Sequence, residues 1–139
     1  MIQIIAGEKG KGKTKVLINN ANTDVRTAKG SIVYVDKSNK HMYELSNKLR
    51  LINVRDFDVE NSSEFIGFIC GLISQDNDLE RIYLDSFLKI ACTDENNYEK
   101  VLKRLEELSE KFHVDFVISI SLNEAQITAP YKPRIILAL

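Results

Sequence analysis

The feature of the sequence that most constrains the fold is a glycine-rich octapeptide at residues 7–14. It reads Gly-Glu-Lys-Gly-Lys-Gly-Lys-Thr and matches the pattern G-x-x-x-x-G-K-[ST] at every fixed position. The apolar run Ile2–Ala6 precedes it, and a helical stretch from Lys13 to about Ala28, closed by Gly30, follows it. A strand, a loop and a helix in this order form the first unit of an α/β fold.

The rest of the chain repeats this alternation of strands and helices. Because strands that alternate with helices pair in parallel through right-handed crossovers, we expect a three-layer α/β/α sandwich. The mainly parallel sheet should hold five to six strands, and residues 1–139 should form a single domain. The further strands are expected at Ser31–Val35, Leu51–Val54, Arg81–Asp85, Val114–Ile120 and Arg134–Leu139.

Three further helices are expected between these strands. One follows Asn61-Ser62-Ser63-Glu64, which resembles a capping box, and runs from Phe65 to about Gln75. Another spans Val101 to Phe112, with one apolar and one charged face. The remaining helix is expected to begin at Ser38 and to turn three apolar side chains toward the core, those of Met42, Leu45 and Leu49.

Composition excludes several classes of protein. With 44% hydrophobic and 28% charged residues, the chain has ordinary globular usage and is not disordered. The longest apolar stretch, Phe65–Ile73, is far shorter than the roughly 20 residues of a membrane-spanning helix. Cys70 and Cys92 both have apolar neighbours, which favours neither a disulfide framework nor a metal cluster. We therefore expect a protein of the reducing cytoplasm, with no membrane partner.

Charge is divided along the chain although the net formal charge is only −1. Residues 1–55 are strongly basic and residues 56–139 are acidic. The basic half could face phosphates or nucleic acid and the acidic half a basic protein partner, unless folding intersperses the two. We expect nucleic-acid binding to be weak or absent, and leave a protein partner or self-association open.

The octapeptide has the chemistry of a phosphate site. Glycines let backbone N–H groups converge on phosphate oxygens, and the N-terminus of the following helix adds partial positive charge. Lys13 can bridge the β- and γ-phosphates, and Thr14 can offer its hydroxyl to Mg²⁺. The alternative is a glycine-rich turn with exposed lysines. The expected binding residues are Gly7, Glu8, Lys9, Gly10, Lys11, Gly12, Lys13, Thr14 and Lys15.

Asp85 is the expected companion of this loop. It ends an apolar strand, where a carboxylate can hold Mg²⁺ beside the phosphates. The alternative role for Asp85 is a helix N-cap before Phe87.

Together, the Walker A motif at residues 7–14 and the Walker B-like Ile82-Tyr83-Leu84-Asp85 make the chain resemble a P-loop NTPase. It resembles the branch with an additional strand beside the P-loop strand, and Leu84-Asp85-Ser86 is similar to the RecA-like form. Short single-domain proteins labelled twitching-motility ATPase-like are also similar, although the acidic and histidine boxes of retraction motors have no counterpart here. The resemblance implies binding of ATP, or another nucleoside triphosphate, with Mg²⁺.

The resemblance also implies a glutamate that orients the attacking water, and here the chain departs from the pattern. The residue after Asp85 is Ser86 rather than glutamate. Asp36, at the end of the second strand, is the expected substitute, with a helix N-cap as its alternative role, and Glu124 is a weaker candidate. Ser121 and Asn123 stand where the resemblance places a polar sensor of the γ-phosphate, although polar residues are common in any loop.

Other residues admit both functional and structural interpretations. Arg134 and Lys132 could act on a neighbouring subunit as an arginine finger does, or form a solvated basic pair. Two glycines four residues apart on one helix face, Gly67 and Gly71, suggest close packing on the sheet or a subunit contact. His41 and His113 lack acidic or cysteine neighbours at ligand spacing, so neither is assigned to a metal.

The sequence thus predicts a P-loop protein that binds ATP and hydrolyses it slowly with Mg²⁺, with Lys13, Asp85 and Asp36 as catalytic residues. Two alternatives remain open. One is a nucleotide-dependent binding module without useful turnover, and the other is a small-molecule kinase, for which an arginine-bearing lid is hard to find.

Overall fold

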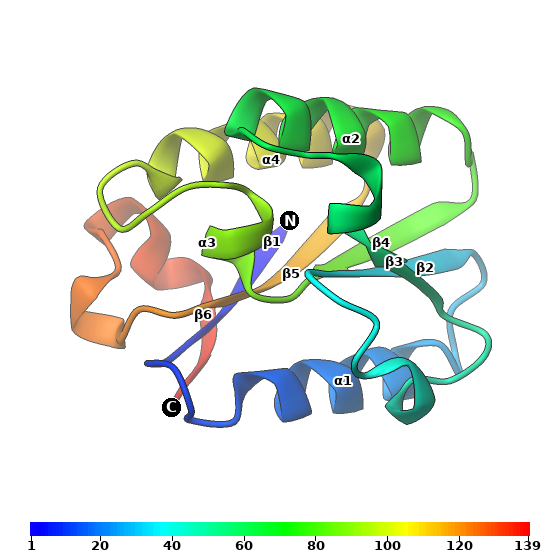
Figure 1. The fold of residues 1–139 in the computed structure, drawn as a ribbon, viewed down its shortest axis with the longest axis horizontal. Coiled ribbons are helices and arrows are strands. Elements are labelled where there is room, and N and C mark those ends of the chain that lie inside the picture. The colour runs from blue at the N-terminus through cyan, green and yellow to red at the C-terminus, as the bar shows by residue number, and fades with distance from the viewer.

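A six-stranded sheet forms the centre of the protein, whose 139 residues are all described by a computed structural model (Figure 1). The order across the sheet is β3-β2-β4-β5-β1-β6, and every neighbouring pair is parallel. The expected parallel α/β fold is therefore confirmed. The strands are β1 (Ile2–Ala6), β2 (Ser31–Asp36), β3 (Arg50–Asn53), β4 (Leu79–Leu84), β5 (Asp115–Ile120) and β6 (Ile135–Ala138).

Helices cover both faces of this sheet. Figure 1 shows α1 (Lys13–Asp24) along one face, with α2 (Ser62–Ser74) and α4 (Tyr98–Phe112) along the other. A short helix, α3 (Phe87–Ile90), follows β4. The three-layer sandwich is as expected. The connections also contain four 3₁₀ turns, at Met42–Glu44, Val54–Phe57, Glu124–Gln126 and Ala129–Arg134.

Alternate residues of the inner strands enter two separate hydrophobic cores. In β2, Val33 and Val35 join the larger core with residues of α2 and α4, whereas Ile32 and Tyr34 join the smaller core with residues of α1. Successive side chains of a strand point to opposite faces, so a sheet covered on both sides needs strands that are apolar at almost every position. This requirement explains why the strands were recognisable as continuous apolar runs.

One strand separates the two motif-bearing strands. β5 pairs with β1 through Ile4 and Ile118, and with β4 through Ile82 and Phe116. It is the additional strand that the sequence resemblance implies. The carboxyl ends of β1, β5, β4 and β2 therefore lie side by side along one edge of the sheet.

The prediction of a helix that begins at Ser38 is wrong. Only the 3₁₀ turn Met42–Glu44 forms in this segment, and Met42 is 48% exposed, whereas Leu45 and Leu49 are buried as expected. The side-chain amide of Asn22 on α1 donates to the Glu44 carbonyl oxygen (2.9 Å) and accepts from the Ser46 backbone N–H (2.8 Å). Because α1 takes up these backbone groups, the segment is held in an irregular path.

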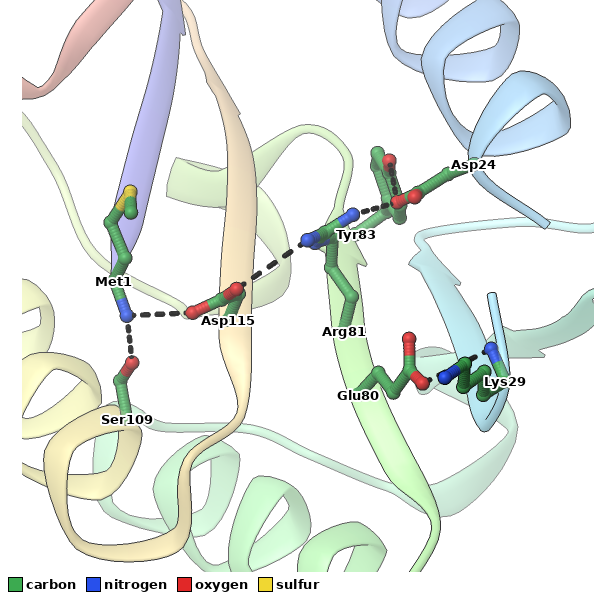
Figure 2. Close-up of polar contacts among 8 residues, drawn as sticks. All are labelled: Met1, Asp24, Lys29, Glu80, Arg81, Tyr83, Ser109 and Asp115. Carbon is green, nitrogen blue, oxygen red and sulfur yellow. Dashed lines mark hydrogen bonds and ion pairs between the residues drawn. The ribbon is translucent and has the colours of Figure 1, made fainter. Parts of the chain in front are cut away.

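The first helix also ends earlier than expected, at Asp24 rather than near Ala28. The Asp24 carboxylate accepts hydrogen bonds from Arg81 and from the Tyr83 hydroxyl, and Arg81 also reaches Asp115 at 3.4 Å (Figure 2). These contacts join the end of α1 to β4 and β5 at the edge of the sheet opposite the octapeptide. The C-terminus of α1 is thereby set by tertiary contacts that a local pattern does not contain.

Gly30 packs against a neighbouring backbone and does not close the helix. A Cβ atom at this position would lie 1.9 Å from the Asp78 carbonyl oxygen. The Gly30 N–H donates to the Glu80 carboxylate at 2.7 Å. The N–H of Lys29 donates to the same oxygen at 3.2 Å (Figure 2). This position requires a residue without a side chain.

The suggestion that Gly67 and Gly71 pack closely on the sheet is wrong. Both are exposed on α2, and a Cβ atom at either would meet nothing within 4 Å. The buried face of α2 is formed by its large apolar residues, among them Phe65 and Ile69, which occupy the space above the sheet. The helix begins at the expected cap, where the Asn61 side chain accepts from the Glu64 N–H (2.9 Å).

No helix of this protein combines the length and the apolar character needed to cross a membrane.

These glycines give a matched test of the fold. Gly30→Ala should lower the free energy of unfolding by more than about 2 kcal/mol, because backbone must move to admit the methyl group. Gly67→Ala and Gly71→Ala should raise it by roughly 0.5–1 kcal/mol each, because alanine restricts the unfolded chain and fits the helix. Urea titrations followed by circular dichroism measure all three. Equal effects at Gly30 and Gly67 would contradict the packing described here.

Candidate functional site

A cleft of about 640 Å³ lies at the carboxyl edge of the sheet. Leu88 is its only hydrophobic lining residue among 16. The lining comes from the octapeptide, from the carboxyl ends of β2 and β5, and from the segments that follow β2, β4 and β5. It comprises Lys9, Gly10, Gly12, Lys13, Thr14, Asp36, Lys37, Ser38, Lys40, His41, Asp85, Ser86, Leu88, Lys89, Ser119 and Ser121. Ligands of open α/β sheets bind at this edge.

The loop between β1 and α1 turns free backbone donors toward this cleft. Gly10 and Gly12 have φ values of +87° and +93°, a conformation that L-residues with side chains rarely adopt. The N–H groups of both glycines donate to no protein atom, and Gly12 begins α1 without a side-chain cap. The first-turn N–H groups of a helix also lack an intrahelical acceptor. The loop therefore presents several unpaired donors where the helix dipole is positive.

Lys13 is held over the loop from the first turn of α1. Its side chain is only 8% exposed, and its Nζ donates to the Glu8 carbonyl oxygen at 3.0 Å. Burial lowers the pKa of Lys13, and the nearby Asp85 carboxylate partly opposes that shift. An ammonium group with one weak protein acceptor, at the floor of an open cleft, can take a stronger anionic partner.

The Asp85 carboxylate is the most heavily hydrogen-bonded group of the cleft. It is 2% exposed. One oxygen, Oδ1, accepts from Ser119 Oγ (2.7 Å), from the Ser86 N–H (2.9 Å) and from Thr14 Oγ1 (3.2 Å). The other, Oδ2, accepts from the Tyr34 hydroxyl at 2.7 Å. The structure thus brings together Thr14 and Asp85, the two residues expected to hold Mg²⁺.

Tyr34 and Ser119 are site residues that the sequence analysis missed. Both point to the α1 side of the sheet, from β2 and β5, and their polar atoms meet at Asp85. Burial, followed by the charge of Asp85, raises the pKa of Tyr34, so its hydroxyl remains a donor. The available signal was a serine inside the otherwise apolar run Phe116–Ile120; Tyr34 itself is indistinguishable from a core aromatic.

The donor set fits Mg²⁺. Mg²⁺ prefers oxygen ligands and is commonly bound by one or two carboxylates, several waters and substrate phosphates. The Thr14 hydroxyl and the Asp85 carboxylate are the matching pair here, and no group of three or more His, Cys, Asp or Glu side chains converges anywhere in the protein. This arrangement suits an ion that arrives with phosphates better than one enclosed by protein ligands.

Asp36 lies in the same cleft and is 2% exposed. Burial and the neighbouring Asp85 raise its pKa to about 6, although the Lys37 N–H, which donates to Asp36 Oδ1 at 2.7 Å, opposes the shift. The alternative of a helix N-cap is wrong because no α-helix begins after β2. A carboxylate with a pKa near neutrality is suited to proton transfer.

Glu124 does not reach the cleft. It borders a different hollow, together with Lys132 and Leu139. The Lys132 ammonium donates to the Glu124 carbonyl oxygen (3.3 Å), and Arg134 pairs with Glu106 of α4 at 3.7 Å. The expected basic pair therefore makes contacts within its own chain.

The two expected sensor residues are separated. Ser121 lines the cleft, whereas Asn123 caps the turn Glu124–Gln126 and donates from Nδ2 to Glu8 Oε1 at 3.3 Å. The two histidines are also apart. His41 lines the cleft and pairs with Glu44, whereas His113 lies by a hollow at the opposite edge of the sheet.

Not every residue of the octapeptide faces the cleft. Gly7 is buried at its base, where its N–H donates to the Leu122 carbonyl oxygen (2.7 Å) and a Cβ atom would lie 3.1 Å from the Leu139 side chain. Three charged residues of the stretch expected to bind phosphate also lie outside the lining: Glu8, Lys11 and Lys15.

Comparison with known proteins supports the fold. No protein-family model matches the chain, and no curated protein matches it. The flagellar accessory protein FlaH from Methanocaldococcus jannaschii has a similar structure, with a TM-score of 0.57 and 14% sequence identity. The likeness covers 93% of this chain but only 63% of the FlaH chain. It supports the parallel α/β fold described above.

Proposed function

We propose that the cleft binds a nucleoside triphosphate together with Mg²⁺, ATP being favoured by the sequence resemblance. The observation that carries the proposal is the meeting of three features in one cleft. These are the unpaired N–H groups at Gly10 and Gly12, the ammonium group of Lys13, and the adjacent oxygens of Thr14 and Asp85. Backbone N–H groups and an ammonium group bind phosphate oxygens, and hydroxyl and carboxylate oxygens bind Mg²⁺.

Each residue would have a defined role. The loop N–H groups and Lys13 would bind phosphate oxygens, with Lys13 leaving the Glu8 carbonyl oxygen to do so. Thr14 and Asp85 would hold Mg²⁺, which supplies charge neutralisation of the phosphates when bound. Ser119 and Tyr34 would keep the Asp85 carboxylate oriented through their hydrogen bonds.

Nucleotide binding is tested by thermal unfolding. ATP with Mg²⁺ at about 100 times its dissociation constant should stabilise the native state by about 2.7 kcal/mol and raise Tm by several degrees. Lys13→Ala should abolish most of this shift because it removes the buried ammonium group. Lys11→Ala is the matched control, since that lysine is exposed and lies outside the cleft. Shifts of the same size in both variants would place the phosphates elsewhere.

We further propose that hydrolysis is slow. The Asp36 carboxylate would accept the proton of the attacking water in place of the missing glutamate after Asp85. Its aspartate side chain is short, and one oxygen already accepts from the Lys37 N–H. The other candidate function, a nucleotide-dependent binding module, is favoured by Ser86, whose N–H bonds to Asp85 where the resemblance implies a catalytic glutamate.

Phosphate release by the purified protein separates these two functions. With Asp36 as base, turnover should rise with pH through about 6, because only the ionised carboxylate accepts a proton. Asp36→Asn should lower turnover by about 10²-fold or more and remove this rise, while nucleotide affinity remains nearly intact. Asp85→Asn should weaken Mg²⁺-dependent binding as well. Brisk turnover insensitive to Asp36→Asn would exclude this base, and absent turnover would favour the binding module.

A further inference from the structure

The cleft contains more cationic side chains than its acidic groups can balance. Five lysines line it, against two carboxylates, those of Asp36 and Asp85. Asp85 already accepts from four hydrogen-bond donors and Asp36 from the Lys37 N–H, and neither carboxylate forms an ion pair with a lysine. The five lysines are Lys9, Lys13, Lys37, Lys40 and Lys89.

Four of these five have no acceptor at all. No lysine of the protein takes part in an ion pair. Only Lys13 and Lys132 donate side-chain hydrogen bonds. Surface lysines usually spread apart or pair with carboxylates, since like charges repel. Converging unpaired ammonium groups in a concave site instead favour an anionic ligand.

The centre of this cluster is the pair Lys37 and Lys89. Both lysines line the cleft, and the nearby charges of Lys37 and Lys9 lower the pKa of Lys89. Lys37 follows β2, and Lys89 lies on α3 after β4. The nearby Leu88 is the one apolar residue of the lining.

The two lysines of this pair follow strands other than β1, which leads into the loop. In the sheet order, β4 and β2 are the second and third strands from β1. Strand spacing places their carboxyl ends roughly 10 and 14 Å from that of β1. The loop N–H groups and Lys13 already meet the needs of phosphates at the end of β1. The backbones of Lys37 and Lys89 therefore lie farther from the end of β1 than the loop does, after the strands whose ends carry Asp36 and Asp85.

We propose that Lys37 and Lys89 form a second anion subsite, which holds a phosphate group additional to those of the nucleotide. This inference rests on the proposed nucleotide function only in that the phosphate group is counted beyond those of a bound nucleotide. The ligand class is a phosphate monoester or a free phosphate dianion. Two flexible ammonium groups suit a compact dianion, and the adjoining Lys40 and His41 leave room for a larger polar ligand.

The test is calorimetric titration with inorganic phosphate at constant ionic strength. The protein is first saturated with Mg²⁺ and a non-hydrolysable ATP analogue, so that the loop is occupied. Phosphate should still bind, and Lys37→Gln/Lys89→Gln should weaken its affinity at least about tenfold, through loss of two charge-assisted hydrogen bonds. Lys100→Gln/Lys103→Gln on exposed positions of α4 is the control of equal charge change and should alter affinity less than about twofold.

Three results would overturn the subsite: absence of phosphate binding, equal weakening by both double variants, or displacement of phosphate by the ATP analogue. In the last case the two lysines would serve the γ-phosphate itself. A titration of Lys13→Ala without nucleotide keeps the two proposals separate. If that variant binds phosphate normally but no ATP analogue, the subsite stands. If the wild-type protein binds no ATP analogue, the nucleotide function fails, and phosphate binding lost with Lys37→Gln/Lys89→Gln would still support the subsite.

Discussion

The arrangement of elements at the carboxyl edge of the sheet depends on the buried carboxylate of Asp85. A charged group at 2% exposure is tolerated only if hydrogen bonds replace the lost water. Here the replacements come from α1, β2 and β5, through Thr14, Tyr34 and Ser119. Each of these elements must therefore sit at a fixed distance from the end of β4. The same contacts place the first turn of α1, and with it the glycine-rich loop, beside the carboxylate.

The two edges of the sheet differ in how their charged side chains are paired. At the edge opposite the cleft, Arg81 joins Asp24 and Asp115, and Tyr83 adds its hydroxyl, so that charges are paired and α1 is joined to the sheet (Figure 2). At the cleft, lysines such as Lys37 and Lys89 form no ion pair. Charges are thus paired within the protein at one edge and unpaired at the other.

The parts of this structure that follow local rules could be predicted from the sequence. Apolar runs indicated the six strands, because both faces of a parallel sheet are buried, and the octapeptide pattern requires glycine where φ is positive, as at Gly12. Tertiary contacts account for what was missed. The contact of Tyr34 with Asp85 depends on which strands are neighbours, and the irregular path after Ser38 depends on Asn22 of α1. Neither contact leaves a periodic signal.

The central claim, that the loop after β1 binds nucleotide phosphates, is tested most directly by the amide resonances of the six glycines of this chain. Addition of an ATP analogue with Mg²⁺ to ¹⁵N-labelled protein should shift the amide signals of Gly10 and Gly12, whose N–H groups are free. The signals of Gly67 and Gly71, exposed on α2, should stay in place. Unchanged Gly10 and Gly12 signals at saturating nucleotide would contradict the account.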